Sequence, residues 1–121
     1  MKYLLIIHNN PALLQSLSPA ELDAMGAAHE PFQAALRETG ELVGFAALTD
    51  PSQAKVVHQP AGSAPVVTDG PYLEAKEHLA GFYVVDCETP ERAAELAALM
   101  PAAAYGGVEV RAVMEEAGLE M

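Results

Sequence analysis

Apolar and polar residues follow different patterns along the chain, and each pattern predicts its own kind of element. Nearly unbroken apolar runs at residues 3–8 and 80–87 predict strands that are buried on both faces. Residues 41–48 and 108–113 are more polar, and the second run alternates cleanly with a period of two. We therefore predict two middle strands and two edge strands of one sheet.

A long helix is predicted to begin at Ser18. The Ser18 side chain caps it, Pro19 occupies the first helical position and Glu21 completes an S-x-x-E capping box. Gly40 is the predicted end, and an apolar stripe at helical spacing lies between: Leu22, Met25, His29, Phe32 and Leu36. Because a proline inside a helix removes a hydrogen bond, Pro31 predicts a kink or break just before it.

Two further elements complete the pattern. Thr89 and Pro90 repeat the cap-then-proline start, and the short apolar helix that follows is closed by Pro101. Residues 55–59 and 64–68 flank the turn sequence QPAGS and predict a short β-hairpin. Without the hairpin, the order is β-α-β followed by β-α-β. The sequence therefore predicts an α+β fold of the ferredoxin-like, split βαβ kind with an antiparallel sheet.

Such a sheet has helices on one face only, yet its predicted middle strands are apolar on both faces. Alternation in the first strand turns Leu4, Ile6 and His8 to one face and the residues between them to the other. An exposed apolar patch of several hundred Å² marks an association site. We therefore expect a homodimer packed sheet to sheet. The alternative is that the hairpin folds over the bare face.

Composition narrows the classes of function. The 121 residues suit one domain, residues 1–121, with a core of its own. The net charge is −11 and the six basic residues are scattered, which argues against nucleic acid and anionic membranes as partners. Cys87 is the single cysteine, so no disulfide can form within the chain. No apolar run has the length of a signal-peptide core or membrane span, so a cytoplasmic location is expected.

Candidate chemistry comes from a few titratable residues. His29 lies on the apolar stripe beside Pro31, where it is either a satisfied core residue or a general base near pH 7. Asp69 either caps an Asp-Gly-Pro turn or points into a cleft as a base. His8 ends a middle strand and is a candidate ligand contact. Arg111 can pair with Glu109 or hold a carboxylate ligand.

The sequence lacks the common motifs for binding a metal ion, a phosphate group or a dinucleotide. The chain has no His or Cys pair at zinc spacing and no Gly-rich phosphate loop or dinucleotide fingerprint. Its serines lack a G-x-S-x-G context, so nucleophilic hydrolase chemistry is not supported. We expect neither a metal nor a cofactor.

The stretch VTDGPYLEAKEHLAGFYVVD resembles the DGPF-domain proteins of the YCII-related family. The matching residues are Asp69-Gly70-Pro71-Tyr72, Glu74, Lys76-Glu77 and Gly81-Phe82, with Tyr72 in place of the more usual Phe. The likeness covers nearly the whole chain and ends at GVEVRAV, where Ala112 replaces the family's proline. The resemblance implies a dimeric α+β barrel of ferredoxin-like halves, which agrees with the fold predicted from the pattern.

The same resemblance implies two kinds of function. Related members include a dehydrochlorinase that acts on a chlorinated aromatic ring, the wider superfamily includes muconolactone isomerase, and some DGPF proteins are associated with extracytoplasmic-function sigma factors. The family's proposed dyad pairs a His on the first helix with an Asp at the end of the second. His29 matches the His, whereas the Asp position falls near Leu99 or Met100, which are neither acid nor base.

Two hypotheses follow. The first is a small-molecule isomerase or lyase that moves a proton on a carboxylated or aromatic ring compound, in a pocket beside the dimer interface. His29 and Asp69 would be its acid and base and Arg111 its anion holder; Tyr72, Lys76 and His8 are further candidate ligand contacts. The second is a non-catalytic homodimer that binds a ligand or a protein partner, with a role in transcriptional regulation.

Overall fold

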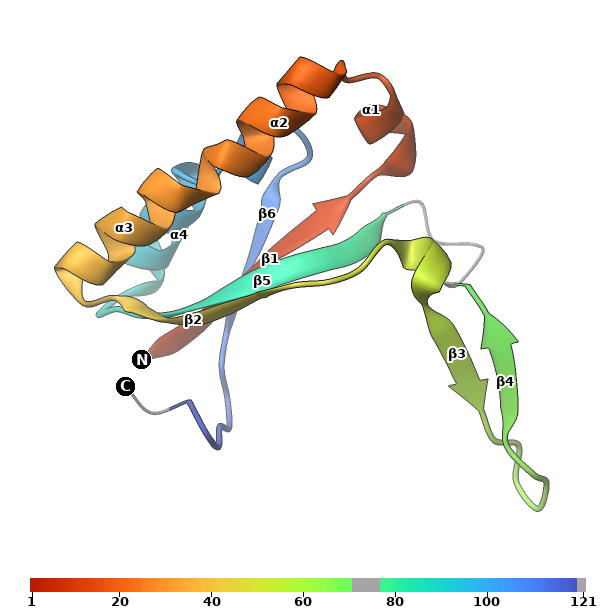
Figure 1. The fold of residues 1–121 in the computed structure, drawn as a ribbon. Helices are drawn as coiled ribbons and strands as arrows, with labels where there is room; N and C mark the ends of the chain where they lie inside the picture. Colours follow the sequence, from red (N-terminus) through yellow and green to blue (C-terminus); the bar gives the residue numbers. More distant parts are fainter. Residues whose placement is uncertain (71–76, 120–121) are drawn as a thin grey trace.

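The computed structural model describes residues 1–70 and 77–119, and it shows a four-stranded antiparallel sheet with helices on one face (Figure 1). The sheet consists of β1 (Lys2–Asn9), β2 (Leu42–Ala47), β5 (His78–Asp86) and β6 (Val108–Ala112). The helices are α1 (Pro11–Gln15), α2 (Pro19–Ala27), α3 (His29–Thr39) and α4 (Pro90–Ala98), with the short 3₁₀ turns η1 (Pro51–Gln53) and η2 (Pro101–Ala104). The predicted ferredoxin-like α+β class is confirmed.

The strand order of the sheet is β2-β5-β1-β6, so the two most apolar strands lie in the middle as predicted. Leu5 of β1 lies opposite Tyr83 of β5 on one side and Val110 of β6 on the other. This register turns Tyr3, Leu5 and Val85 to the helix side, where they join Phe32, Leu36, Leu96 and Met100 in the core. Burial of these side chains is the main source of the stability of the domain.

The long N-terminal helix is divided at Ala28, where α2 ends and α3 begins. The predicted capping box is present, since the Ser18 hydroxyl accepts from the Glu21 amide and the Glu21 carboxylate accepts from the Ser18 amide. Pro31 occupies the third position of α3. An amide in the first turn of a helix has no acceptor within the helix, so a break at Ala28 lets Pro31 stay without losing a bond. The predicted break is confirmed.

The short helix α1 was not predicted. Its N-cap is Asn10, whose side-chain oxygen accepts a hydrogen bond from the Ala12 amide at 2.9 Å, and Pro11 takes the first helical position. This is the same cap-then-proline signal that marks Ser18 and Thr89. In the sequence, Asn10-Pro11 fits the end of the first strand equally well, so the pattern does not distinguish the two.

The strands β3 (Lys55–His58) and β4 (Val66–Asp69) form the predicted hairpin as a separate two-stranded sheet. It projects away from the end of the main sheet (Figure 1). Val57, Val66 and Val67 are 64%, 50% and 56% exposed, so the hairpin does not fold over the face of the main sheet. The sequence left open that the hairpin, and not a second chain, covers the bare face of the sheet. The structure contradicts this alternative.

The face of the sheet opposite the helices is partly closed within the chain. Ile6 and Val84, at its centre, are buried. The segment that follows β6 returns to this region, because the Lys2 ammonium lies 2.7 Å from a carboxylate oxygen of Glu116. The uncovered apolar face that we expected is therefore smaller than the strand pattern implies.

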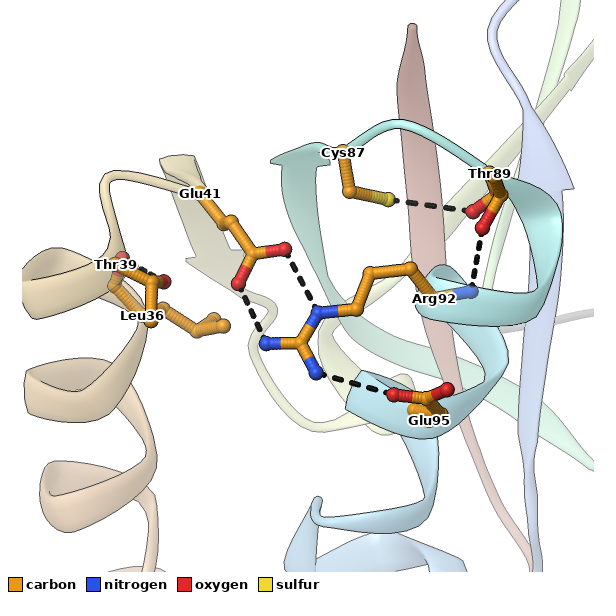
Figure 2. Close-up of polar contacts among 7 residues, drawn as sticks. All are labelled: Leu36, Thr39, Glu41, Cys87, Thr89, Arg92 and Glu95. Carbon is orange, nitrogen blue, oxygen red and sulfur yellow. Dashed lines mark hydrogen bonds and ion pairs between the residues drawn. The ribbon is translucent and has the colours of Figure 1, made fainter.

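An ion pair links the start of β2 to α4 (Figure 2). The Arg92 guanidinium donates two hydrogen bonds to the Glu41 carboxylate, at 3.0 and 2.8 Å, and a third to Glu95 at 3.1 Å. Glu41 is well covered, with a side chain 14% exposed, and the hydrogen bond from Arg92 lowers the pKa of its carboxyl. Two-point contact of this kind fixes both partners in orientation. It holds the chain between α3 and β2 against the first turn of α4.

Gly81 allows β2 and β5 to pair closely. A Cβ atom at Gly81 would lie 2.6 Å from the carbonyl oxygen of Ala46. We expect Gly81→Ala to lower the free energy of unfolding by about 1–3 kcal/mol, because backbone atoms must move to admit the methyl group. Gly26→Ala is the control, since its Cβ meets nothing within 4 Å, and it should raise stability by about 0.5–1 kcal/mol. Urea unfolding measures both; equal stability of Gly81→Ala and wild type would contradict the close approach.

The Glu41–Arg92 pair makes stability depend on pH. The folded-state pKa of Glu41 lies below its ordinary value of 4.5, so its contribution is present above pH 4.5 and is lost as the pH falls through the folded-state value. We expect Glu41→Gln to lower the melting temperature by about 3–5 °C at neutral pH, and the difference from wild type to shrink below pH 4.5. The exposed Glu95→Gln is the control and should have little effect. A gap between Glu41→Gln and wild type that stays constant in acid would refute this role.

Candidate functional site

A cavity of about 320 Å³ lies between the helices α2 and α3 and the sheet. Its walls are mostly apolar and include Met25 of α2 and Phe45 of β2. The strand residues beside it are small, since Ala46, Ala80 and Gly81 line it. Small side chains leave this end of the helix–sheet layer unfilled, and its size is at the lower end for small-molecule sites.

Two polar side chains of the cavity lining, His29 and Gln33, meet the hydroxyl of Tyr83. The His29 Nδ1 atom lies 3.0 Å from the Tyr83 Oη atom, and the Gln33 Nε2 atom donates to the same oxygen at 3.0 Å. His29 and Gln33 are four residues apart on α3, so they share one face of the helix. Two polar side chains of a helix therefore meet one strand residue at the wall of the cavity.

Aromatic contacts fix the position of the Tyr83 ring, which is only 3% exposed. Phe32 meets it edge to face with ring centres 5.1 Å apart, and Phe45 lies tilted against it at 5.4 Å. The His29 ring is nearly parallel to it, with an interplanar angle of 14°. Such packing leaves the hydroxyl little freedom, so the hydrogen bonds to α3 have a defined direction.

Burial in this apolar setting lowers the pKa of His29 from its ordinary value of 6.5. Charged imidazolium is disfavoured where water is excluded, so the ring is neutral at pH 7. No carboxylate or cationic side chain is among the cavity-lining residues in the described part of the chain. A neutral imidazole bonded to a phenol can accept or deliver a proton next to an apolar ligand.

Asp69, the second predicted acid–base residue, lies on the hairpin and does not line this cavity. Its side chain is 88% exposed and its carboxylate lies 2.6 Å from the Lys55 ammonium. The two residues face each other across β3 and β4, which makes this a cross-strand ion pair. Within one chain, the structure does not bring Asp69 together with His29.

His8 and Arg111 lie on the face of the sheet opposite the helices. Arg111 is opposite Leu4 in the register of β1 and β6, whereas Tyr83 points to the helix side. The His8 Nε2 atom lies 2.8 Å from one Glu109 carboxylate oxygen, and the Arg111 Nε atom lies 3.6 Å from the other. These three form a polar cluster of their own, so Arg111 cannot hold an anion in the His29 cavity of the same chain.

The remaining predictions concern residues 71–76 and bound metal. Tyr72 and Lys76 lie outside the described residues. Over residues 1–70 and 77–119, no three His, Cys, Asp or Glu side chains gather as a metal site. Nor does any helix in these ranges have the length and apolar character needed to cross a membrane.

The sequence suggested His29 as a candidate but not Tyr83 and Gln33, which the structure brings together with it. The spacing of four from His29 was the signal for Gln33, because it puts both side chains on the same helical face. Tyr83 carried a weaker signal, as a single polar atom within the apolar run of a middle strand. Such a hydroxyl has to find a partner when it is buried.

The lowered pKa of His29 has a measurable consequence. We expect the ring to titrate below 6.5 in the folded protein and to return to its ordinary value in concentrated urea, as followed by ¹H–¹⁵N NMR. Because the unfolded state binds the proton more readily, the contribution of His29 to stability is complete above pH 6.5 and is lost as the pH falls. A folded-state midpoint at or above the value in urea would contradict the burial of the ring.

Comparison with known proteins identifies relatives of the chain. Residues 1–117 match the YCII-related domain. The chain is 30% identical over 97 residues to "Uncharacterized protein R00369" of Rhizobium meliloti (strain 1021), a match that covers 80% of this chain and 77% of that protein. The family match thus spans both the sheet and the helices that enclose the His29 cavity. The chain belongs to the YCII-related domain family.

Proposed function

We propose that the protein is a small-molecule isomerase or lyase that moves a proton in the cavity of His29 and Tyr83. The observation that carries the proposal is the 3.0 Å contact between His29 Nδ1 and Tyr83 Oη at the wall of an apolar cavity of about 320 Å³. A histidine with a perturbed pKa, in a cleft of this kind, is typical of proton-transfer sites. The pocket is expected to lie beside a homodimer interface.

The chemistry of the proposal needs no bound group. In an isomerase, His29 Nε2 takes a proton from one carbon of the ligand, in the tautomer whose own proton is on Nδ1, and the imidazolium returns it to another carbon. In a lyase, Nε2 takes the proton and the leaving group departs with the electron pair of its bond to carbon. His29 Nε2 is the atom that meets the ligand, since no residue in the described part of the chain bonds to it. The walls of the cavity are mostly apolar, and hydrogen bonds to developing charge are stronger in such surroundings than in water.

Substitution of His29 tests the proposal against a panel of ring lactones and chlorinated phenols. For a compound that the wild type converts, we expect His29→Gln to lower kcat by about 100-fold or more, as for a lost acid–base group. His58→Gln, the same change at an exposed position of the hairpin, is the matched control and should leave kcat unchanged. Equal activity of His29→Gln and wild type would refute the role of the cavity.

The Asp69→Asn variant belongs in the same assay. We expect it to lower kcat by less than tenfold, because its carboxylate is paired with Lys55 outside the cavity. A loss as large as that of His29→Gln would contradict this expectation and assign the hairpin a direct part in the reaction.

The second candidate is a non-catalytic homodimer that binds a ligand or a protein partner, with a role in transcription. The hairpin favours the homodimer. A two-stranded sheet is marginally stable on its own in water. Val57 and Val67 lie opposite each other on one face of it and are more than half exposed. A second copy of the chain is the occupant that fits, because residues 55–69 hold one Lys and one Asp that pair with each other, so the hairpin meets a chain of net charge −11 without like-charge repulsion.

Sedimentation velocity at micromolar concentration tests the homodimer. We expect a species of twice 12.7 kDa for the wild type, and of 12.7 kDa for the double variant Val57→Asp, Val67→Asp. Leu99→Asp, at a residue 65% exposed on the C-cap of α4, is the control and should remain a dimer. A wild-type protein that sediments only as a monomer would overturn the homodimer.

A further inference from the structure

We propose that Gln33 is a positioning residue that determines which nitrogen of His29 carries the proton, and that the cavity therefore takes an uncharged ligand with a hydrogen-bond acceptor, such as a carbonyl oxygen. The statement about Gln33 stands on geometry alone. The statement about the ligand rests on the proposed function of the cavity.

Gln33 determines which group donates in each of the two hydrogen bonds at the Tyr83 hydroxyl. An amide nitrogen donates and cannot accept, so the Gln33 Nε2 contact of 3.0 Å places one N–H on the Tyr83 oxygen. Tyr83 has a single hydroxyl proton, and its other neighbour is His29 Nδ1 at 3.0 Å. The hydroxyl therefore donates to Nδ1, which must be unprotonated. In the neutral ring, the proton then lies on Nε2.

The opposite arrangement would leave a polar group unsatisfied. If Nδ1 carried a proton, two donors would point at the Tyr83 oxygen and the hydroxyl proton would have no acceptor among the described residues. A buried hydroxyl without a partner is costly. Gln33 therefore disfavours both the other neutral tautomer and the imidazolium in the unliganded site, and it acts in the same direction as the burial that lowers the pKa of His29.

The class of ligand follows from the exposed end of the His29 ring. Its Nε2–H has no acceptor in the described part of the chain, and the described walls of the cavity carry no Lys or Arg. Because His29 lines a mostly apolar cavity, an unpaired N–H of its ring favours a ligand that brings an acceptor. A carboxylate would lose its hydration without meeting a cation, whereas a ketone, ester or lactone oxygen loses much less. This inference replaces the carboxylated ligand that Arg111 suggested in the sequence.

The tautomer can be measured by ¹⁵N NMR with labelled histidine, independently of any activity. In the wild type above the pKa of His29, we expect Nδ1 to show the shift of an unprotonated nitrogen and Nε2 that of an N–H nitrogen. Gln33→Glu replaces the donor with an acceptor, so Tyr83 should then donate to residue 33 and the two His29 shifts should exchange. Ala34→Glu adds the same charge at an exposed neighbour on α3 and should leave the tautomer unchanged.

Two results would overturn the role of Gln33: a wild-type His29 with its proton on Nδ1, or a Gln33→Glu variant with the wild-type tautomer. The ligand class is tested with two probes that share a ring, cyclohexanone and cyclohexanecarboxylate, by titration of the His29 Nε2–H resonance. We expect cyclohexanone to bind at least tenfold more tightly. Equal or tighter binding of the carboxylate would overturn the ligand class and leave the tautomer result intact. The turnover of lactones and chlorinated phenols tests the proposed function separately.

Discussion

The hydroxyl of Tyr83 is the constraint on which the rest of the site depends. It sits on a middle strand, in a side chain that is 3% exposed, so it cannot be satisfied by bulk water. A buried hydroxyl must find protein partners, and α3 supplies two of them in His29 and Gln33. This link sets the rotation of α3 over the sheet at the same time as Phe32 and Leu36 fill the core. The apolar packing holds the helix in place, and the polar link aligns it.

The cavity exists because the side chains of the sheet are small where α2 approaches it. Gly81 cannot carry a side chain without striking the Ala46 carbonyl oxygen, and Ala47, its partner in β2, has only a small side chain. Close pairing of β2 with β5 therefore leaves space on the helix side. Gly81 is part of the motif by which the sequence resembles its family, and the structure gives that glycine a physical reason. The glycine that lets β2 and β5 pair closely therefore also leaves room for a ligand.

Most of the fold could be predicted because its signals are local. The capping box at Ser18, the proline at position 31 and the two apolar runs each act within a few residues, and all were interpreted correctly. The helix α1 carried the same kind of local signal at Asn10-Pro11 and was missed only because the strand end beside it explained those residues as well. The partial closure of the face opposite the helices could not be predicted, since the contact between Lys2 and Glu116 joins residues 114 positions apart.

The site was harder to predict because it is made by contacts between distant segments. His29 and Tyr83 are 54 residues apart, and no pattern along either element shows that they meet. Arg111 was assigned to the site by residue type alone. Strand alternation should have prevented this, since Arg111 shares a face with Glu109, away from Val108 and Val110, which pack on the core. Residue type identifies candidates, and only the register of the strands shows which of them face the same cavity.

The most direct test of this account is observation of the Tyr83 hydroxyl proton by NMR. A hydroxyl held between two partners away from water exchanges slowly, so its resonance should be visible in the folded protein, with nuclear Overhauser contacts to the His29 ring and the Gln33 side-chain amide. If the proton exchanges too fast to be seen, or if its contacts are to residues other than those two, the polar link between α3 and the sheet does not exist, and the site built on it is wrong.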